Sequence, residues 1–179
     1  ANFIPDARNS EVSGKTIEDF SNTPSAGASG HATSVGMRFY GLTISMTPGV
    51  TNIGRYGAEP FLFEFRKYGV SSSPEQSIRR VANNSWVGNY LSNSNGEILP
   101  LATSNVLRRL DWIIERDEFI QVAAPNNSTV GSRHLLTTAY NVITAGRTAD
   151  NHLDSVNGID AIYVTGRPAT HLVSPQPVP

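Results

Sequence analysis

The sequence predicts an all-β fold: an antiparallel β-sandwich, jelly-roll or immunoglobulin-like, with one or two short helices and extended terminal arms. Three observations lead to this prediction. About eight short apolar segments follow one another at intervals of roughly 8 to 25 residues, several of them with alternating polar residues. No strand-like segment alternates with a long helical pattern, which argues against a parallel α/β sheet. Both ends of the chain are rich in small residues or proline.

The chain of 179 residues suits one domain with attached arms. Residues 1–34 are interpreted as a flexible N-terminal arm, because its second half holds small and polar residues without apolar periodicity. Residues 35–173 then form the β-sandwich domain. Residues 174–179 form a proline-rich C-terminal tail that cannot enter the interior of a sheet. We expect both ends to become ordered by docking on neighbouring subunits.

Alternating apolar and polar side chains predict the strands. In residues 40–46 the alternation is regular, and in residues 61–68 three phenylalanines share a face opposite Glu64 and Arg66. The dipeptide Asn95-Gly96 predicts the turn of a hairpin. The remaining strands are expected at residues 86–91, 97–99, 119–124, 135–143 and 159–165.

A helix start is predicted at Ser73, which can cap a helix whose first position is Pro74 and whose third is Gln76. The helix would be short and would end before Asn83. It would be unstable in water alone, so we expect it to lie against a sheet.

Residues 106–114 fit two interpretations. Leu107, Leu110 and Ile114 have helical spacing, whereas the β-branched residues and Trp112 favour a strand. We take the strand, which makes the charged residues 115–118 an exposed turn.

The composition excludes several classes of protein. Lys and Arg number 14 against 15 for Asp and Glu, a net charge of −1, so we expect no direct binding of nucleic acid or of an anionic membrane. The sequence contains no cysteine, which removes disulfides and thiolate chemistry. No stretch is long and apolar enough to span a bilayer, and the start of the chain does not resemble a signal peptide. A virion or extracellular location is expected.

The sequence lacks the common catalytic signatures. The sequence has no phosphate-binding P-loop, no dinucleotide-binding glycine pattern, no H-E-x-x-H and no G-x-S-x-G. The four histidines are far apart, and Glu115, Asp117 and Glu118 are interpreted as an exposed turn rather than as a hydrolytic pair. We therefore expect neither an enzyme nor a cofactor.

Oxygen-bearing side chains gather in residues 150–160, which hold three aspartates and two asparagines. Calcium prefers such ligands, but the spacing does not match the twelve-residue calcium loop, and these residues also form ordinary turns. The plain loop is the favoured interpretation, with a calcium site as the alternative.

The function predicted from this architecture is that of a structural or assembly protein without enzymatic activity, such as a capsid, decoration or tail subunit of a virus or phage. It would self-associate through its sandwich and its arms. The alternative is a carbohydrate-binding module or adhesin on the same fold. Its possible glycan contacts are Trp86, Tyr90, Tyr56, Asn126 and Asp154.

Overall fold

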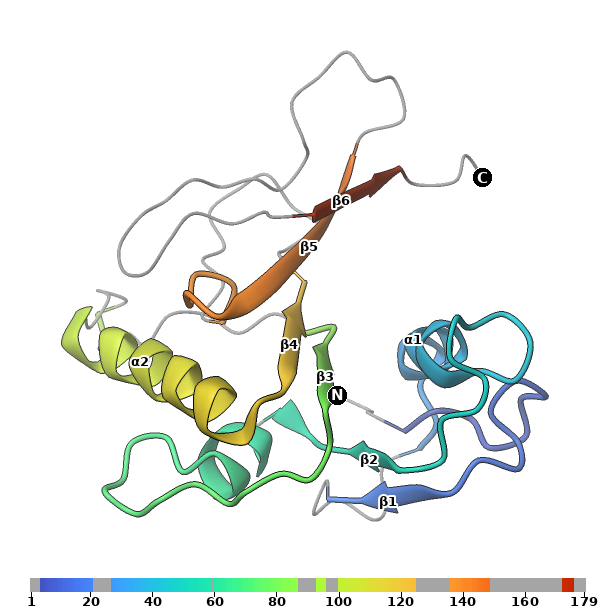
Figure 1. Cartoon of the computed structure of the whole chain (residues 1–179), viewed down its shortest axis with the longest axis horizontal. Coiled ribbons are helices and arrows are strands. Elements are labelled where there is room, and N and C mark those ends of the chain that lie inside the picture. Colours follow the sequence, from blue (N-terminus) through green and yellow to red (C-terminus); the bar gives the residue numbers. More distant parts are fainter. Residues whose placement is uncertain are drawn as a thin grey trace. The chain divides into compact units, whose positions relative to one another are not determined.

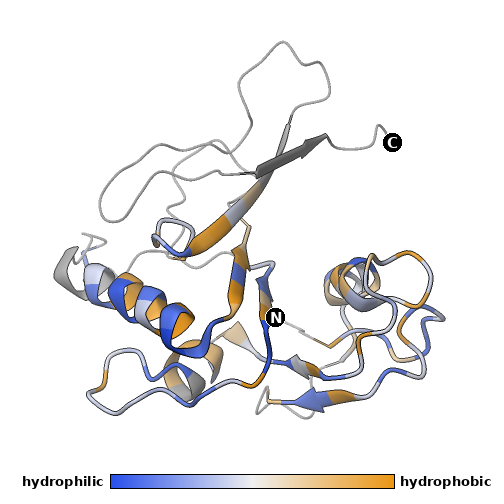
Figure 2. Ribbon diagram, viewed as in Figure 1, coloured by the Kyte–Doolittle hydropathy of each residue, from blue (hydrophilic) through white to orange (hydrophobic). Residues whose placement is uncertain are grey.

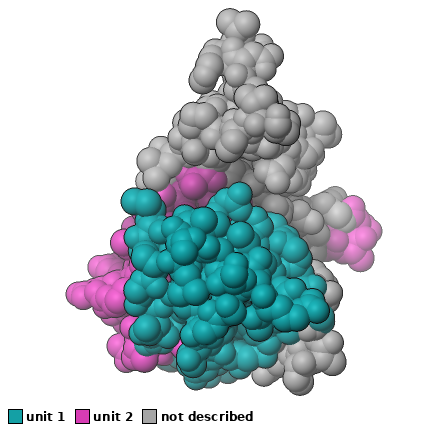
Figure 3. All heavy atoms as spheres, turned by 90° about the vertical axis from the view of Figure 1, so that its right-hand side faces the viewer, with its two compact units in different colours: residues 1–67, 71–75 teal, residues 68–70, 76–179 magenta. Residues whose placement is uncertain are grey.

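The strands pair in parallel in the computed structural model, which describes residues 4–20, 27–58, 60–86, 93–95, 100–124, 136–148 and 172–175. The chain divides into two compact units, coloured separately in Figure 3. Unit 1 comprises residues 1–67 and 71–75, and unit 2 comprises residues 68–70 and 76–179. Figure 1 shows the elements of both units.

Unit 1 contains a two-stranded parallel sheet and one α-helix. Strand β1 (Ile17–Asp19) pairs with β2 (Ile53–Arg55), and helix α1 (Gly30–Tyr40) lies between them in the sequence. A π-helical turn, Pro60–Phe65, follows β2. Val12, Tyr40 and Ile53 are buried together, with Ile17 and Met37 packed against them, and Phe61 and Leu62 of the same unit are buried as well.

Unit 2 contains a parallel sheet in the order β3-β4-β5-β6. Its strands are β3 (Val81–Asn84), β4 (Ile120–Ala123), β5 (Val142–Thr148) and β6 (Leu172–Pro175). Helix α2 (Pro100–Asp117) connects β3 to β4, as a parallel pair requires. Apolar residues are concentrated on β4 and β5, as Figure 2 shows.

Helix α2 buries one apolar face. The buried residues recur at helical spacing, and exposed Arg108, Trp112 and Glu115 lie between them. The buried set is Val106, Leu107, Leu110, Ile113 and Ile114. Of the described helices, neither is long and apolar enough to cross a membrane.

The predicted antiparallel β-sandwich, whether jelly-roll or immunoglobulin-like, is therefore wrong. Residues 106–114 belong to α2 and not to a strand, because a helix places Leu107, Leu110 and Ile114 on one buried face. The β-branched residues that favoured a strand are overridden by this burial. Once α2 is a helix, β3 and β4 can pair in parallel.

Residues 61–68 are also not a strand. The Phe61 amide donates to the carbonyl of Gly57 at 2.9 Å, and the Arg66 amide donates to that of Phe61 at 2.9 Å, so this segment coils. Phe61 is buried and Phe63 is 52% exposed, which places them on different faces. The predicted strand at 40–46 fails too, because α1 continues to Tyr40 and residues 42–46 form bends.

The helix predicted from Ser73 is absent: residues 73–79 form no helix or strand, and only residues 81 and 82, at its expected end, belong to β3. Val81 and Asn84 pair with Ile120 and Ala123 of β4, so main-chain pairing overrides the local helix-start signature. The strand predicted at 119–124 is confirmed by β4. The one predicted at 135–143 overlaps only the start of β5, since residues 136–141 form turns.

The prediction of extended terminal arms is wrong in the part of the chain that the structure describes. Residues 30–34 form the start of α1, and Ser174 and Pro175 pair with Arg147 and Thr148 of β5. The division into residues 1–34, 35–173 and 174–179 otherwise stays a prediction. The predicted strand at 159–165 and most of the hairpin around Asn95 lie outside the described residues.

Candidate active site at the start of helix α1

His31 occupies the second position of α1 and is exposed. Of the four histidines in the sequence, the structure describes His31; His134, His152 and His171 lie outside the described residues. Imidazole is the side chain best suited to accept and donate protons near neutral pH. An exposed histidine on a fixed helical turn is therefore a candidate general base.

Ser29 caps α1 directly before this histidine. Its backbone is extended, with φ −113° and ψ 130°, and its hydroxyl oxygen accepts from the amide of Ala32 at 3.3 Å. The Ser29 carbonyl accepts from Thr33 twice, from the amide at 2.9 Å and from the hydroxyl at 2.8 Å. Hydrogen bonds to Ser29 thus stabilise the first turn of α1, which contains His31.

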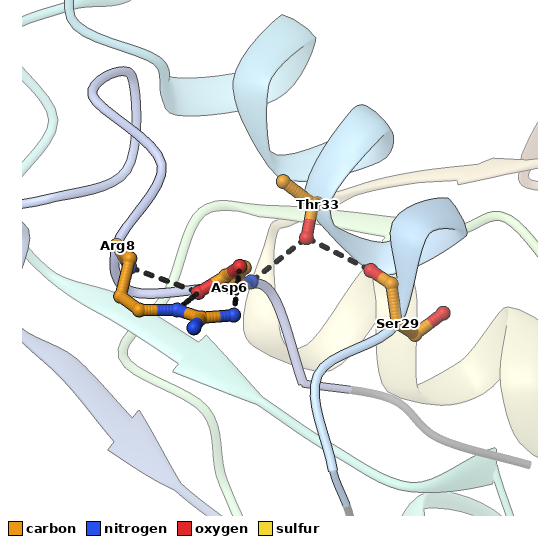
Figure 4. Close-up of polar contacts among 4 residues, drawn as sticks. All are labelled: Asp6, Arg8, Ser29 and Thr33. Carbon is orange, nitrogen blue, oxygen red and sulfur yellow. Dashed lines mark hydrogen bonds and ion pairs between the residues drawn. The ribbon is translucent and has the colours of Figure 1, made fainter.

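Residues 4–6 hold the same turn from the other side, as Figure 4 shows in part. The Ser29 amide donates to the Ile4 carbonyl at 2.8 Å, and Ile4 forms a parallel bridge with Ala28. The Asp6 amide donates to the Thr33 hydroxyl oxygen at 2.7 Å. Two segments that are distant in sequence therefore meet immediately around the helix start.

The carboxylate of Asp6 is engaged with Arg8. Its Oδ1 accepts from the Arg8 amide and from Nε, and its Oδ2 accepts from Nη2, all at 3.0 Å. These bonds hold the pKa of Asp6 below its ordinary value and raise that of the Arg8 guanidinium. Because the Arg8 side chain is 89% exposed, the pair organises a turn and contributes little to stability.

In unit 2, a second polar group lies at the carboxyl end of β3, the edge at which open α/β sheets bind ligands. Asn84 is only 5% exposed, and its Nδ2 has no hydrogen-bond partner among the described residues. The neighbouring Asn83 Nδ2 donates to the Ser85 hydroxyl at 2.9 Å. Asn84 is thus a buried donor available at this edge.

Of the residues predicted as glycan contacts, the structure describes Trp86 and Tyr56, which belong to different units. Trp86 follows β3 in unit 2, whereas Tyr56 follows β2 in unit 1. The Tyr56 ring stacks on Phe20 with centroids 4.8 Å apart and meets Phe61 edge-on at 5.7 Å, so its faces serve packing. Tyr90, Asn126 and Asp154 lie outside the described residues, and all five stay untested as ligand contacts.

Metal chemistry finds no support in the described ranges, where no three acidic or histidine side chains form a possible metal site. The calcium alternative concerned residues 150–160, which fall outside those ranges.

The prediction that residues 115–118 form an exposed turn is wrong at residue 117. Asp117 is buried, and it accepts from Arg116 Nε at 2.6 Å and from the Ser77 amide at 3.3 Å.

Sequence reasoning missed His31 as a site residue because it missed α1. The helix buries Thr33, Gly36 and Tyr40, with Met37 half-buried, which is helical spacing without an apolar stripe. The absence of a side chain at Gly36 leaves room for the Tyr40 ring, since a Cβ there would lie 2.7 Å from the phenolic oxygen. The usable signal was the cap, Ser29, ahead of residues at that spacing.

Comparison with known proteins identifies a fold rather than a family. No family model matches the chain, and no curated protein matches its sequence. The chain is similar to the solved structure of the prenylagaramide maturation protease PagA, with a TM-score of 0.52 and 14% identity over 88% of this chain. It covers 55% of that structure's chain, about half its length. The likeness shows a shared fold.

This finding overturns the predicted function. The capsid, decoration or tail subunit, and the carbohydrate-binding module or adhesin, were both inferred from a β-sandwich. The fold instead has parallel sheets and resembles that of a protease. The expectation that the chain is no enzyme is corrected on the same finding. Self-association was a separate expectation and stays a prediction.

Proposed function

We propose that this chain forms part of a peptidase in which His31 transfers protons during hydrolysis of a peptide bond. The observation that carries the proposal is the placement of this exposed imidazole on a helical turn that hydrogen bonds fix from two sides. The likeness to the fold of a maturation protease supports the reaction class.

Hydrolysis of a peptide bond needs two proton transfers. A base removes a proton from the nucleophile, and an acid then protonates the leaving amine; one imidazole performs both steps in turn. Since the sequence has no cysteine, a nucleophile supplied by this chain is a hydroxyl, unless water itself attacks. The Asp6 carboxylate is bound by Arg8, so we assign it no proton-transfer role.

The proposal is tested by incubating the full chain with a mixture of synthetic peptides and detecting cleavage by mass spectrometry. We expect cleavage by the unmodified chain and a loss of about 10²-fold to 10⁴-fold in His31→Gln, the usual contribution of a general base. Arg38→Gln is the matched control, because Arg38 is exposed on the same helix. Absence of cleavage by the unmodified chain, or full activity of His31→Gln, would refute the proposal.

A fluorophosphonate probe determines the kind of nucleophile. Such a probe labels a hydroxyl that a neighbouring base activates, and mass spectrometry locates the labelled residue. We expect label on one serine or threonine of the unmodified chain and none in His31→Gln. Peptide cleavage without labelling would assign the attack to water.

A further inference from the structure

The hydroxyl of Thr33 joins the two segments that surround the candidate base. It donates to the Ser29 carbonyl at 2.8 Å and accepts from the Asp6 amide at 2.7 Å. Thr33 is 8% exposed, so these protein partners take the place of water. Figure 4 shows the hydroxyl between residue 6 and the capping residue of α1.

The two bonds have different consequences for the fold. The Ser29 carbonyl also accepts from the Thr33 amide at 2.9 Å, so the start of the helix keeps a bond when the hydroxyl is removed. The Asp6 amide has the hydroxyl as its described acceptor, and residues 5 and 6 would lose this tie to α1. Removing the hydroxyl should therefore loosen the tie and leave the helix formed.

We propose that Thr33 is a positioning residue for His31, and this inference rests on the proposed peptidase function. His31 lies two residues before Thr33, within the turn that the hydroxyl fixes against residues 4–6. Hydrolysis needs the imidazole within hydrogen-bond reach of the nucleophile, and a misplacement of about 1 Å can cost about 10²-fold in rate. Thr33 touches neither substrate nor nucleophile in this role.

The test compares Thr33→Val, which keeps the shape of the side chain, with Thr33→Ser, which keeps the hydroxyl. We expect Thr33→Val to lower kcat by about 10-fold to 10²-fold with KM changed by less than about twofold, because orientation and not substrate binding is lost. Thr33→Ser should restore kcat to within about threefold of the unmodified chain.

Thr43→Val is the matched control. It removes a hydroxyl from the same unit, one that donates to the Glu11 carboxylate outside the α1 turn. We expect it to leave kcat within about twofold. An unchanged kcat in Thr33→Val, an equal loss in Thr33→Ser, or an equal loss in Thr43→Val would overturn the positioning role.

A second measurement keeps the inference testable if the chain cleaves no peptide, a result that would refute the proposed function alone. Diethylpyrocarbonate acylates exposed imidazoles, and peptide mass spectrometry follows His31 separately from the other histidines. We expect its acylation rate to change by about threefold or more in Thr33→Val and to be restored in Thr33→Ser, because acylation depends on access to the ring. Equal rates in all three chains would overturn the positioning role.

Discussion

The two units of this chain differ in how many apolar side chains their described parts bury. The described part of unit 1 buries Val12, Tyr40, Ile53, Phe61 and Leu62. In unit 2, Leu110, Ile113 and Val142 are each 0% exposed. The described part of unit 2 buries more apolar side chains than that of unit 1, and such burial is a large stabilising contribution, so we expect the stability of unit 2 to depend more on its core.

Two charged side chains of unit 1 bind the loop after α1. The Glu11 carboxylate accepts from the Thr43 amide at 2.8 Å and from the Ile44 amide at 3.1 Å, and also from the Thr43 hydroxyl. The Lys15 ammonium donates to the carbonyls of Pro48 and Val50. Two opposite charges thus hold one loop at both of its ends.

The largest expected effect is in the core of unit 2. Leu110→Ala should lower the free energy of unfolding by about 2–5 kcal/mol, because it leaves a cavity where the side chain is fully buried. Urea denaturation followed by far-UV circular dichroism measures this loss. Glu115→Ala, on the exposed face of α2, is the control. A loss below about 1 kcal/mol would contradict apolar stabilisation of unit 2.

The next effect concerns the end of α1. Gly41→Ala places a Cβ 2.2 Å from the Met37 carbonyl oxygen and 2.8 Å from Glu11 Oε2, so the backbone must shift. We expect a loss of about 1–3 kcal/mol in unit 1, measured by amide hydrogen exchange of α1. Gly49→Ala is the matched control, because nothing lies within 4 Å of its Cβ position. Equal exchange in both variants would contradict this close approach.

Loss of the cap of α1 should have a smaller effect. Ser29→Ala removes the acceptor of the Ala32 amide and should cost about 1 kcal/mol, seen as faster exchange in the first turn. Ser29→Asp supplies another side-chain acceptor and should restore protection. If Ser29→Asp exchanges as fast as Ser29→Ala, the hydroxyl is not the stabilising group.

The smallest effect is a pH dependence confined to the loop. The Thr43 hydroxyl, followed by the backbone amides, lowers the pKa of Glu11 below the ordinary value of 4.5. Its stabilisation is therefore complete above pH 4.5 and is lost as the pH falls through the lowered pKa. The amide resonances of Thr43 and Ile44 should titrate with a midpoint below 4.5, and Glu11→Gln should abolish that titration. A midpoint at or above 4.5 would contradict the stabilisation of the ionised Glu11 carboxylate by these hydrogen bonds.

Sequence reasoning succeeded at residues 119–124, a short apolar run that ends before Pro125, although polarity does not follow burial there. In β4, Gln121 and Ala123 are buried between more exposed neighbours, and this segment was predicted correctly. It failed at 106–114, where one run of residues satisfies both spacings and the length of the helix decides. An error in that one connection changed a parallel fold into an antiparallel one.

The candidate site was hidden for a different reason. The buried face of α1 is made of Thr33, Gly36 and Tyr40, and hydrophobic periodicity does not detect buried threonine or glycine. The contacts of Thr33 also join residues 27 positions apart, as its bond from Asp6 shows. Local propensity carries no information about such a pairing. The sequence therefore shows that His31 is present but does not predict its position at the start of a helix.

Both tryptophans of the sequence, Trp86 and Trp112, belong to unit 2, and unit 1 has none. Excitation near 295 nm therefore reports from one half of the molecule alone, without any engineered label. Fluorescence and amide exchange recorded on the same sample would show whether the halves melt together or in succession.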